Sequence, residues 1–246
     1  MEEPNKAIWL YNTCLRNDIR LEEGQLKLLE LFVSGLLEWN GRVNLISRRD
    51  EENIWEKHIL HSISFLFRVW LPIESRVLDL GSGGGLPGVP LKVVRPDLSV
   101  TLLDATQKKV KAVNDIVASL GLSDIKAVWG RAEDLGKEKE YAGRYDLVVA
   151  RAVAPLNELV RWSRPFLKKA REHPEKDATP PPRPFEVMVS KPTLIAFKGG
   201  ELENEISQLK KRTDIGSVST IELGTWGAAQ LEGGDKKLVV VEFLNS

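Results

Sequence analysis

The residues best suited to chemistry are grouped in the stretch RVLDLGSGGGLPG, residues 76–88, where an apolar run gives way to glycines. The apolar run predicts a buried parallel strand, and the spacing of apolar residues from Gly88 onward predicts a helix. Gly81, Gly83 and Gly85 allow positive φ angles and a close approach of the backbone to a ligand. A glycine loop between a strand and a helix suits a nucleotide-type cofactor, although glycine clusters also occur in ordinary surface turns.

An acidic residue on the next predicted strand favours the cofactor interpretation. Asp104 follows the apolar run Val100–Leu103 and lies 23 positions after Gly81. A carboxylate at this place can accept hydrogen bonds from both ribose hydroxyls of an adenosine-containing cofactor. The loop and the acid together therefore predict an adenosine-type cofactor.

The length and composition of the chain narrow the classes of protein to which it can belong. With 246 residues and 42% hydrophobic content, the chain can bury a full core. No segment approaches the roughly 18 to 20 apolar residues of a membrane span, and the N-terminal residues lack the pattern of a signal peptide. We therefore expect a cytoplasmic protein without a membrane partner. The single cysteine, Cys14, excludes an internal disulfide, and we interpret it as a packing residue.

The charge of the chain is balanced, with 35 basic and 35 acidic residues, so no global charge indicates a nucleic-acid partner. Basic residues nevertheless form local clusters, each of which is also typical of a solvated helix face. Together they permit a basic surface along one edge of the sheet: Lys108, Lys109 and Lys111; Arg161, Arg164, Lys168, Lys169 and Arg171; and Lys210, Lys211 and Arg212.

Residues 1–72 are predicted to be helical. The segment 21–37 has apolar residues at spacings of three and four, which indicates an amphipathic helix. Asp50 is predicted to cap a further helix, on which His58 and His61 share one face. We expect no metal site there, because the sequence offers no third ligand nearby. We expect this region to be a helical extension packed on a sheet domain that comprises residues 73–246.

From residue 76 onward, predicted strands and helices alternate, which is typical of a doubly wound α/β sheet. The last two strands are joined by loop sequence alone and predict an antiparallel hairpin. The proline-rich segment 171–192 is predicted to be a mobile, solvated insertion, with a proline-recognising ligand as the alternative. The seven predicted strands are Val77–Leu80, Val100–Leu103, Ile125–Trp129, Leu147–Ala150, Leu194–Phe197, Val218–Leu223 and Leu238–Phe243.

A mostly parallel sheet that ends in a hairpin does not suit a nicotinamide dehydrogenase, whose second half repeats a βαβαβ unit. It resembles the Rossmann-like methyltransferases that use S-adenosylmethionine. In these enzymes, the pattern DxGxGxG, here at Asp79, Gly81, Gly83 and Gly85, approaches the cofactor. The resemblance also implies that Asp104 binds the ribose.

The methyl acceptor is narrowed partly by absent motifs. Carbon-5 methylation of cytosine needs a cysteine nucleophile, and Cys14 lies far from the glycine loop in the sequence. Adenine N6 enzymes have a [DN]PP[YF] sequence after the fourth strand, where this chain has ARAVAP at 150–155. A small-molecule O-methyltransferase needs a metal-binding acidic set or a base, but the only histidine beyond the N-terminal region is His173.

Seven short motifs occur in order along the chain. They are NLIS at 44–47, KHILHS at 57–62, VLDLGSGGGLPGVPLKVVRP at 77–96, LLD at 102–104, RAED at 131–134, ARAVAPL at 150–156 and FKG at 197–199. Together they resemble the GidB-type bacterial small-subunit rRNA 7-methylguanine methyltransferases. The resemblance implies a monomer that methylates 16S rRNA, in the small ribosomal subunit or an assembly intermediate. It also implies a cofactor site lined by Gly81, Leu86, Ala132, Glu133 and Arg151.

Guanine N7 suits a site without a catalytic base, because N7 carries a lone pair and no proton. The protein then has only to align and hold the reactants. Arg151, Lys198 and His58 are our candidates for positioning the cofactor or the RNA. The alternatives are a structural salt bridge for Arg151 and a solvated surface position for Lys198. For the whole chain, the alternative is a non-catalytic, nucleotide-binding regulatory module. The acid that the family often has at position 61 is a histidine here.

Overall fold

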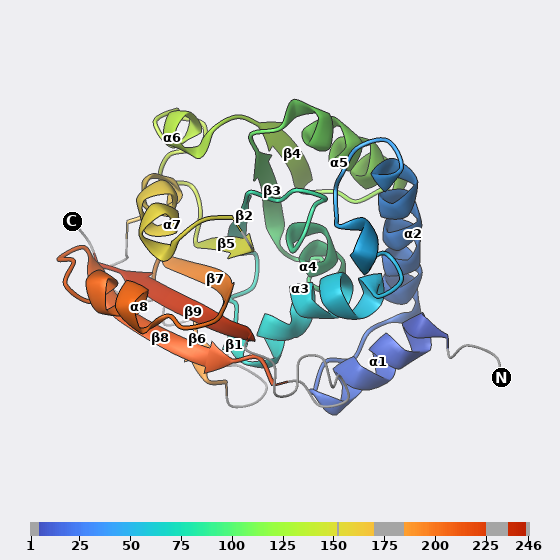
Figure 1. Ribbon diagram of the computed structural model, residues 1–246, viewed down its shortest axis with the longest axis horizontal. Helices are drawn as coiled ribbons and strands as arrows, with labels where there is room; N and C mark the ends of the chain where they lie inside the picture. Colours follow the sequence, from blue (N-terminus) through green and yellow to red (C-terminus); the bar gives the residue numbers. More distant parts are fainter. Residues whose placement is uncertain (1–4, 152, 170–184, 225–235, 245–246) are drawn as a thin grey trace.

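The computed structural model describes residues 5–151, 153–169, 185–224 and 236–244. Within these ranges the chain forms a seven-stranded sheet in the order β4-β3-β2-β5-β7-β9-β8 (Figure 1). The first five strands in this order are parallel, and β9 is antiparallel to both β7 and β8. The strands are β2 (Arg76–Leu80), β3 (Ser99–Asp104), β4 (Ile125–Trp129), β5 (Leu147–Arg151), β7 (Thr193–Gly199), β8 (Ile215–Glu222) and β9 (Lys236–Phe243).

All seven predicted strands are present, and the predicted Rossmann-like fold with a terminal antiparallel hairpin is confirmed. The reason is the apolar character of the central strands, which are covered on both faces and therefore lack an alternating polar side. In β5, for example, the four residues 147–150 are fully buried.

Helices cover both faces of the sheet (Figure 1). The N-terminal helices lie with α4 and α5 on one face, where they share a single apolar core with β2, β3 and β5. The last three helices pack on the opposite face. The α-helices are α1 (Lys6–Arg16), α2 (Glu23–Asn40), α3 (His61–Ile63), α4 (Gly88–Val94), α5 (Gln107–Ser119), α6 (Ala132–Leu135), α7 (Leu156–Ser163) and α8 (Glu203–Leu209).

The segment that precedes α3 is less regular than the sequence predicts. It contains the 3-10 turn η1 (Arg48–Asp50) and the π-helix η2 (Trp55–Leu60). Further 3-10 turns within the described ranges are η3 (Ser64–Phe67) and η4 (Arg164–Phe166). The prediction that Asp50 caps a helix is wrong, because Asp50 belongs to η1 and the N-cap of η2 is Ile54. The Asp50 carboxylate instead accepts a hydrogen bond from Lys57 Nζ at 2.5 Å. Helix α7 ends at Ser163, because Pro165 lacks the N–H that a longer helix needs.

Cys14 is fully buried in α1, and burial raises the pKa of its thiol to about 12, which confirms its interpretation as a packing residue. None of the helices in the described ranges is long and apolar enough to cross a membrane.

The proline-rich segment 171–192 lies outside the described residues up to position 184. Its last part forms the short strand β6 (Val187–Met188), which pairs in parallel with β1 (Val69–Trp70). Phe185 packs against Trp70 with ring centroids 5.5 Å apart. The end of this segment is therefore packed against the region between the N-terminal helices and the sheet, rather than solvated throughout.

Candidate cofactor and active site

The glycine loop joins β2 to α4 and bends over the end of β3. Gly81, Gly83 and Gly85 have φ angles of 74°, 55° and 82°, a region in which residues with a Cβ are strained. The amides of Gly81 and Ser82 both donate to Leu103 O, at 2.8 and 3.0 Å. These bonds hold the loop at the carboxyl edge of the sheet, where open α/β sheets bind ligands.

Asp79 lies under this loop and is inaccessible to solvent. Its Oδ2 accepts a hydrogen bond from the Gly88 amide at 2.7 Å, while Oδ1 has no hydrogen-bond partner among the described residues. Burial raises the pKa of Asp79 to about 7, although the Gly88 amide and the Arg151 guanidinium act in the opposite direction. A Cβ on Gly88 would lie 2.2 Å from Leu102 Cδ2, so only glycine lets α4 begin this close to Asp79.

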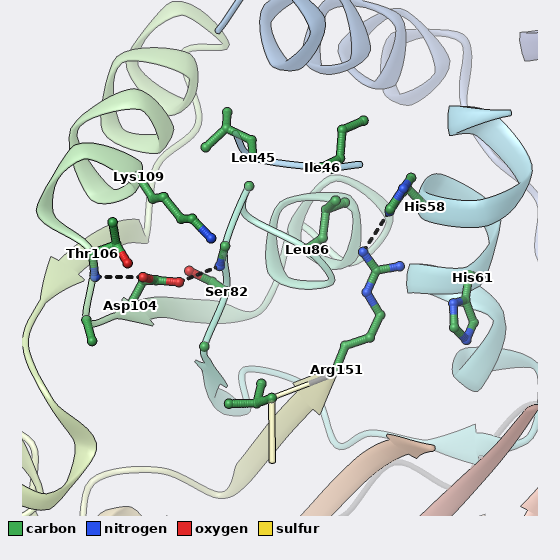
Figure 2. Close-up of a pocket in the computed structure, with 15 residues that line it drawn as sticks. Leu45, Ile46, His58, His61, Ser82, Leu86, Asp104, Thr106, Lys109 and Arg151 are labelled. Atoms are coloured by element: carbon green, nitrogen blue, oxygen red, sulfur yellow. Dashed lines mark hydrogen bonds between the residues drawn. The ribbon is translucent and has the colours of Figure 1, made fainter. Parts of the chain in front are cut away.

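Asp104 ends β3 and fixes the loops on both sides of it. Its Oδ2 accepts from the Gly83 amide at 2.9 Å, and its Oδ1 accepts from the Thr106 amide at 2.7 Å (Figure 2). A carboxylate has about four acceptor sites, so each oxygen keeps a lone pair for a further donor. The half-buried Asp104 can therefore receive two hydroxyl groups without losing the bonds that hold it.

Arg151 ends β5 and reaches across the cavity to the π-helix η2 (Figure 2). Its Nη1 donates to Lys57 O at 3.2 Å, and its Nη2 lies 2.9 Å from His58 Nδ1. Because a guanidinium only donates, His58 Nδ1 accepts and a neutral ring carries its proton on Nε2. That nitrogen lies 3.6 Å from Asp50 Oδ2. Asp50, His58 and Arg151 thus lie in a row. The contact between His58 and Arg151 is a hydrogen bond, whereas His58 Nε2 has no hydrogen-bond partner among the described residues.

Burial and the neighbouring charges shift the pKa values of His58 and Arg151. Burial, and after it the Arg151 guanidinium, lower the pKa of His58 to about 4, although Asp50 acts in the opposite direction. Burial also lowers the pKa of Arg151 to about 10, with Asp79 and Asp50 acting in the opposite direction. At neutral pH, Arg151 is therefore a cation and His58 is a neutral acceptor.

These groups surround one cavity of about 570 Å³, within the usual size range of small-molecule sites. Of the residues expected from the sequence, His58, Gly81, Gly83, Leu86, Asp104 and Arg151 line it. The wall also contains residues that were not predicted from the sequence to belong to the site: Leu45, Ile46, His61, Thr106, Lys109 and Val153. Leu45 and Ile46 belong to the NLIS motif, and Lys109 to the basic cluster after Asp104, so both signals were present but unassigned.

The remaining expected residues lie outside the wall of the cavity. Gly85 forms the turn into α4, and Ala132 and Glu133 begin α6 after β4. Lys198 Nζ donates to Ala154 O at 3.3 Å and lies 3.6 Å from Glu205 Oε2. No group of three or more metal-binding side chains was found within the described ranges.

Comparison with solved structures shows the fold. The predicted O-methyltransferase Atu636 of Agrobacterium tumefaciens is 14% identical, with a TM-score of 0.53 over 76% of this chain and 80% of that one. M. jannaschii TYW2, solved in complex with AdoMet, is 13% identical, with a TM-score of 0.52 over 82% of this chain and 78% of that one.

Curated sequences give closer relatives. A protein of Moorella thermoacetica called ribosomal RNA small subunit methyltransferase G is 41% identical over 61% of this chain, but the match spans only 62% of the relative. A protein of the same name from Thermoanaerobacter is 39% identical over 83% of this chain and 79% of its own length. The model of the GidB family, described as rRNA small subunit methyltransferase G, matches residues 25–173. The resemblance inferred from the motifs is thus confirmed, and the chain belongs to the GidB family of rRNA small subunit methyltransferases.

Proposed function

We propose that this chain transfers the methyl group of S-adenosylmethionine to N7 of a guanine in 16S rRNA. The observation that carries the proposal is the convergence of the glycine loop, Asp104 and Arg151 on one cavity at the carboxyl edge of the sheet. Family membership supports the substrate class, since the relatives carry the name ribosomal RNA small subunit methyltransferase G. We further propose that the enzyme acts as a cytoplasmic monomer on the small ribosomal subunit or an assembly intermediate.

The residues present fit S-adenosylmethionine. Asp104 has acceptor sites left for two ribose hydroxyls, Gly81 and Gly83 line the cavity without side chains of their own, and Leu45 and Leu86 give the wall an apolar part. When bound, S-adenosylmethionine supplies a methyl group on a sulfonium, which passes to the N7 lone pair as the positive charge moves from sulfur to guanine. Asp79 contributes indirectly, by fixing the loop through Gly88.

The site needs no general base for this acceptor, because N7 loses no proton in the reaction. His58 is poorly suited to act as a base, since its Nδ1 faces the Arg151 guanidinium and its pKa is lowered to about 4. We propose that His58 instead orients Arg151, together with Lys57 O. The held guanidinium is then available to position the reactants, with little entropy left to lose on binding.

Lys198 takes a different role in this proposal from the one expected at a ligand-binding strand end. Its ammonium holds Ala154 O, and Glu205 Oε2 accepts the Leu156 amide at 2.5 Å. Both contacts fix the segment that follows β5. Val153 in that segment lines the cavity, so we propose that Lys198 positions the cavity wall.

A transfer assay tests the proposal. The purified chain is incubated with methyl-labelled S-adenosylmethionine and with 16S rRNA that lacks the modification, either free or in the small subunit. We expect label in 7-methylguanine, identified by mass spectrometry of nucleosides. Calorimetric binding of S-adenosylmethionine without any transfer would instead favour the non-catalytic module, and preferential binding of NAD would contradict the cofactor assignment.

A further inference from the structure

A second surface lies beside the cofactor cavity, at the outer edge of the sheet. Trp129 ends the edge strand β4 in register with Asp104 on β3. Its indole Nε1 donates to Ala105 O at 3.1 Å, yet 55% of the residue remains exposed. The ring is therefore held in one orientation while much of it stays open to solvent, which is unusual for so large an apolar group.

Trp129 forms one side of a groove of about 510 Å³ whose other side is α5. Lys108 and Lys111 lie three positions apart on this helix, so they share a face, and both are exposed. Neither lysine has a carboxylate within ion-pair distance among the described residues. Asp115 also lines the groove, one turn further along the helix from Lys111. The groove thus combines an aromatic ring with two unpaired cations.

The edge strand β4 does not offer its Ala127 backbone groups to a peptide that would extend the sheet. Asn114 Nδ2 donates to Ala127 O, and Asn114 Oδ1 accepts from Ala127 N, both at 3.0 Å. A peptide that added a strand to β4 would need these same backbone groups. An aromatic ring beside free lysines is instead the arrangement that binds single-stranded nucleic acid, by stacking on a base and contacting phosphates.

The groove and the cofactor cavity are adjacent. Ala105, whose carbonyl holds the Trp129 indole, lines the cavity, and so does Lys109 from the first turn of α5. Figure 2 shows the Lys109 side chain extending into the cavity. A strand of RNA that lies in the groove would therefore be continuous with a nucleotide in the cavity.

We propose that Trp129, Lys108 and Lys111 bind a single-stranded nucleotide of the RNA substrate, next to the guanine that enters the cavity. Trp129 stacks on the base, and the lysines contact its phosphates. This inference rests on the proposed function, because it assigns a further contact to the same substrate. Stacking of this kind predicts a loss of RNA affinity of roughly 5- to 100-fold when the ring is removed.

The test uses four variants of the full chain: Trp129→Ala, Trp129→Phe, the double variant Lys108→Gln/Lys111→Gln, and a matched control with two exposed lysines, Lys210→Gln/Lys211→Gln. These two lysines follow α8 on the face opposite α5, so they do not share one basic edge with the α5 lysines as the sequence predicts. KM and kcat for 16S rRNA, and the Kd of S-adenosylmethionine, are measured for each. We expect Trp129→Ala to raise the RNA KM roughly 5- to 100-fold with an unchanged cofactor Kd. Trp129→Phe should keep most of the affinity, and the Lys108/Lys111 variant should reduce the salt dependence of RNA binding, while the control behaves as wild type.

Three results would overturn the inference. One is a wild-type RNA KM in Trp129→Ala. Another is a cofactor Kd that rises together with the RNA KM in Trp129→Ala, which would show that the indole acts through the Ala105 loop. The third is a defect confined to ribosomal particles and absent with free 16S rRNA, because the groove would then contact a protein. If wild type itself transfers no methyl group, the proposed function fails, and binding of a single-stranded oligonucleotide to wild type and to Trp129→Ala still tests the groove.

Discussion

The buried carboxylate under the glycine loop predicts a specific dependence of stability on pH. The pKa of Asp79 rises from 3.8 to about 7 on folding, mainly because the group is buried. Between these values the native state keeps a proton that the unfolded chain releases, so the free energy of unfolding falls as pH rises. A difference of about three pH units between the two pKa values corresponds to about 4 kcal/mol in the free energy of unfolding. More than half of this contribution is lost between about pH 5 and pH 8.

Asp79→Asn removes this ionisation while keeping an oxygen for the Gly88 amide. We expect the variant to lack the decline, so that its stability relative to wild type increases by about 2 to 3 kcal/mol from about pH 5 to about pH 8. Urea unfolding of both proteins at several pH values, without cofactor, measures the difference. A difference that does not change with pH would refute the assignment of a raised pKa to this carboxyl. A difference of opposite sign would mean that the ionised form is stabilised in the native state.

Three further substitutions test other parts of the site. Asp104→Asn leaves one acceptor oxygen where two now serve the loops. We therefore expect calorimetry to show that S-adenosylmethionine binds about 10- to 100-fold more weakly. An unchanged affinity would contradict the proposed role of Asp104. Gly88→Ala places a Cβ against Leu102, and we expect a loss of about 1 to 3 kcal/mol in urea unfolding, whereas Gly24→Ala, which meets no atom within 4 Å, should cost nothing. Arg151→Ala should abolish methyl transfer while circular dichroism remains native, and an active variant would reject its positioning role.

Much of the fold could be predicted because its strands are buried on both faces. Parallel strands covered by helices are mostly apolar, so the run at 147–150, and the apolar residues on both sides of Asp79 at 77–80, stand out in the sequence. The glycine loop and Asp104 were predictable for a related reason. Their positions follow from the ends of neighbouring parallel strands, which meet at one edge of the sheet.

The rest of the site depends on contacts between distant parts of the chain. Arg151 and His58 are 93 positions apart, and their contact depends on a π-helix that the apolar spacing of the segment does not reveal. Lys198 does follow the rule for strand ends, but its side chain lies against Ala154 rather than in the cavity wall. Residue type and strand position therefore locate the edge of the sheet, while the direction of each long side chain depends on its tertiary partners.

The match to the family model ends near the start of the proline-rich segment. It covers residues 25–173, and that segment begins at 171. The part of the chain that carries the glycine loop, Asp104 and Arg151 lies wholly inside the matched range. The proposed cofactor site therefore lies within the part of the chain that matches the family model.

Mapping of 7-methylguanine in 16S rRNA shows whether this chain methylates guanine N7 in cells. A bacterial strain that lacks its own member of this family is complemented with this chain or with its Arg151→Ala variant, and its 16S rRNA is analysed by mass spectrometry of nuclease fragments. We expect the wild-type chain to restore one 7-methylguanine and the variant, present at equal level, not to restore it. An rRNA without 7-methylguanine despite a folded, cofactor-binding wild-type chain would contradict it.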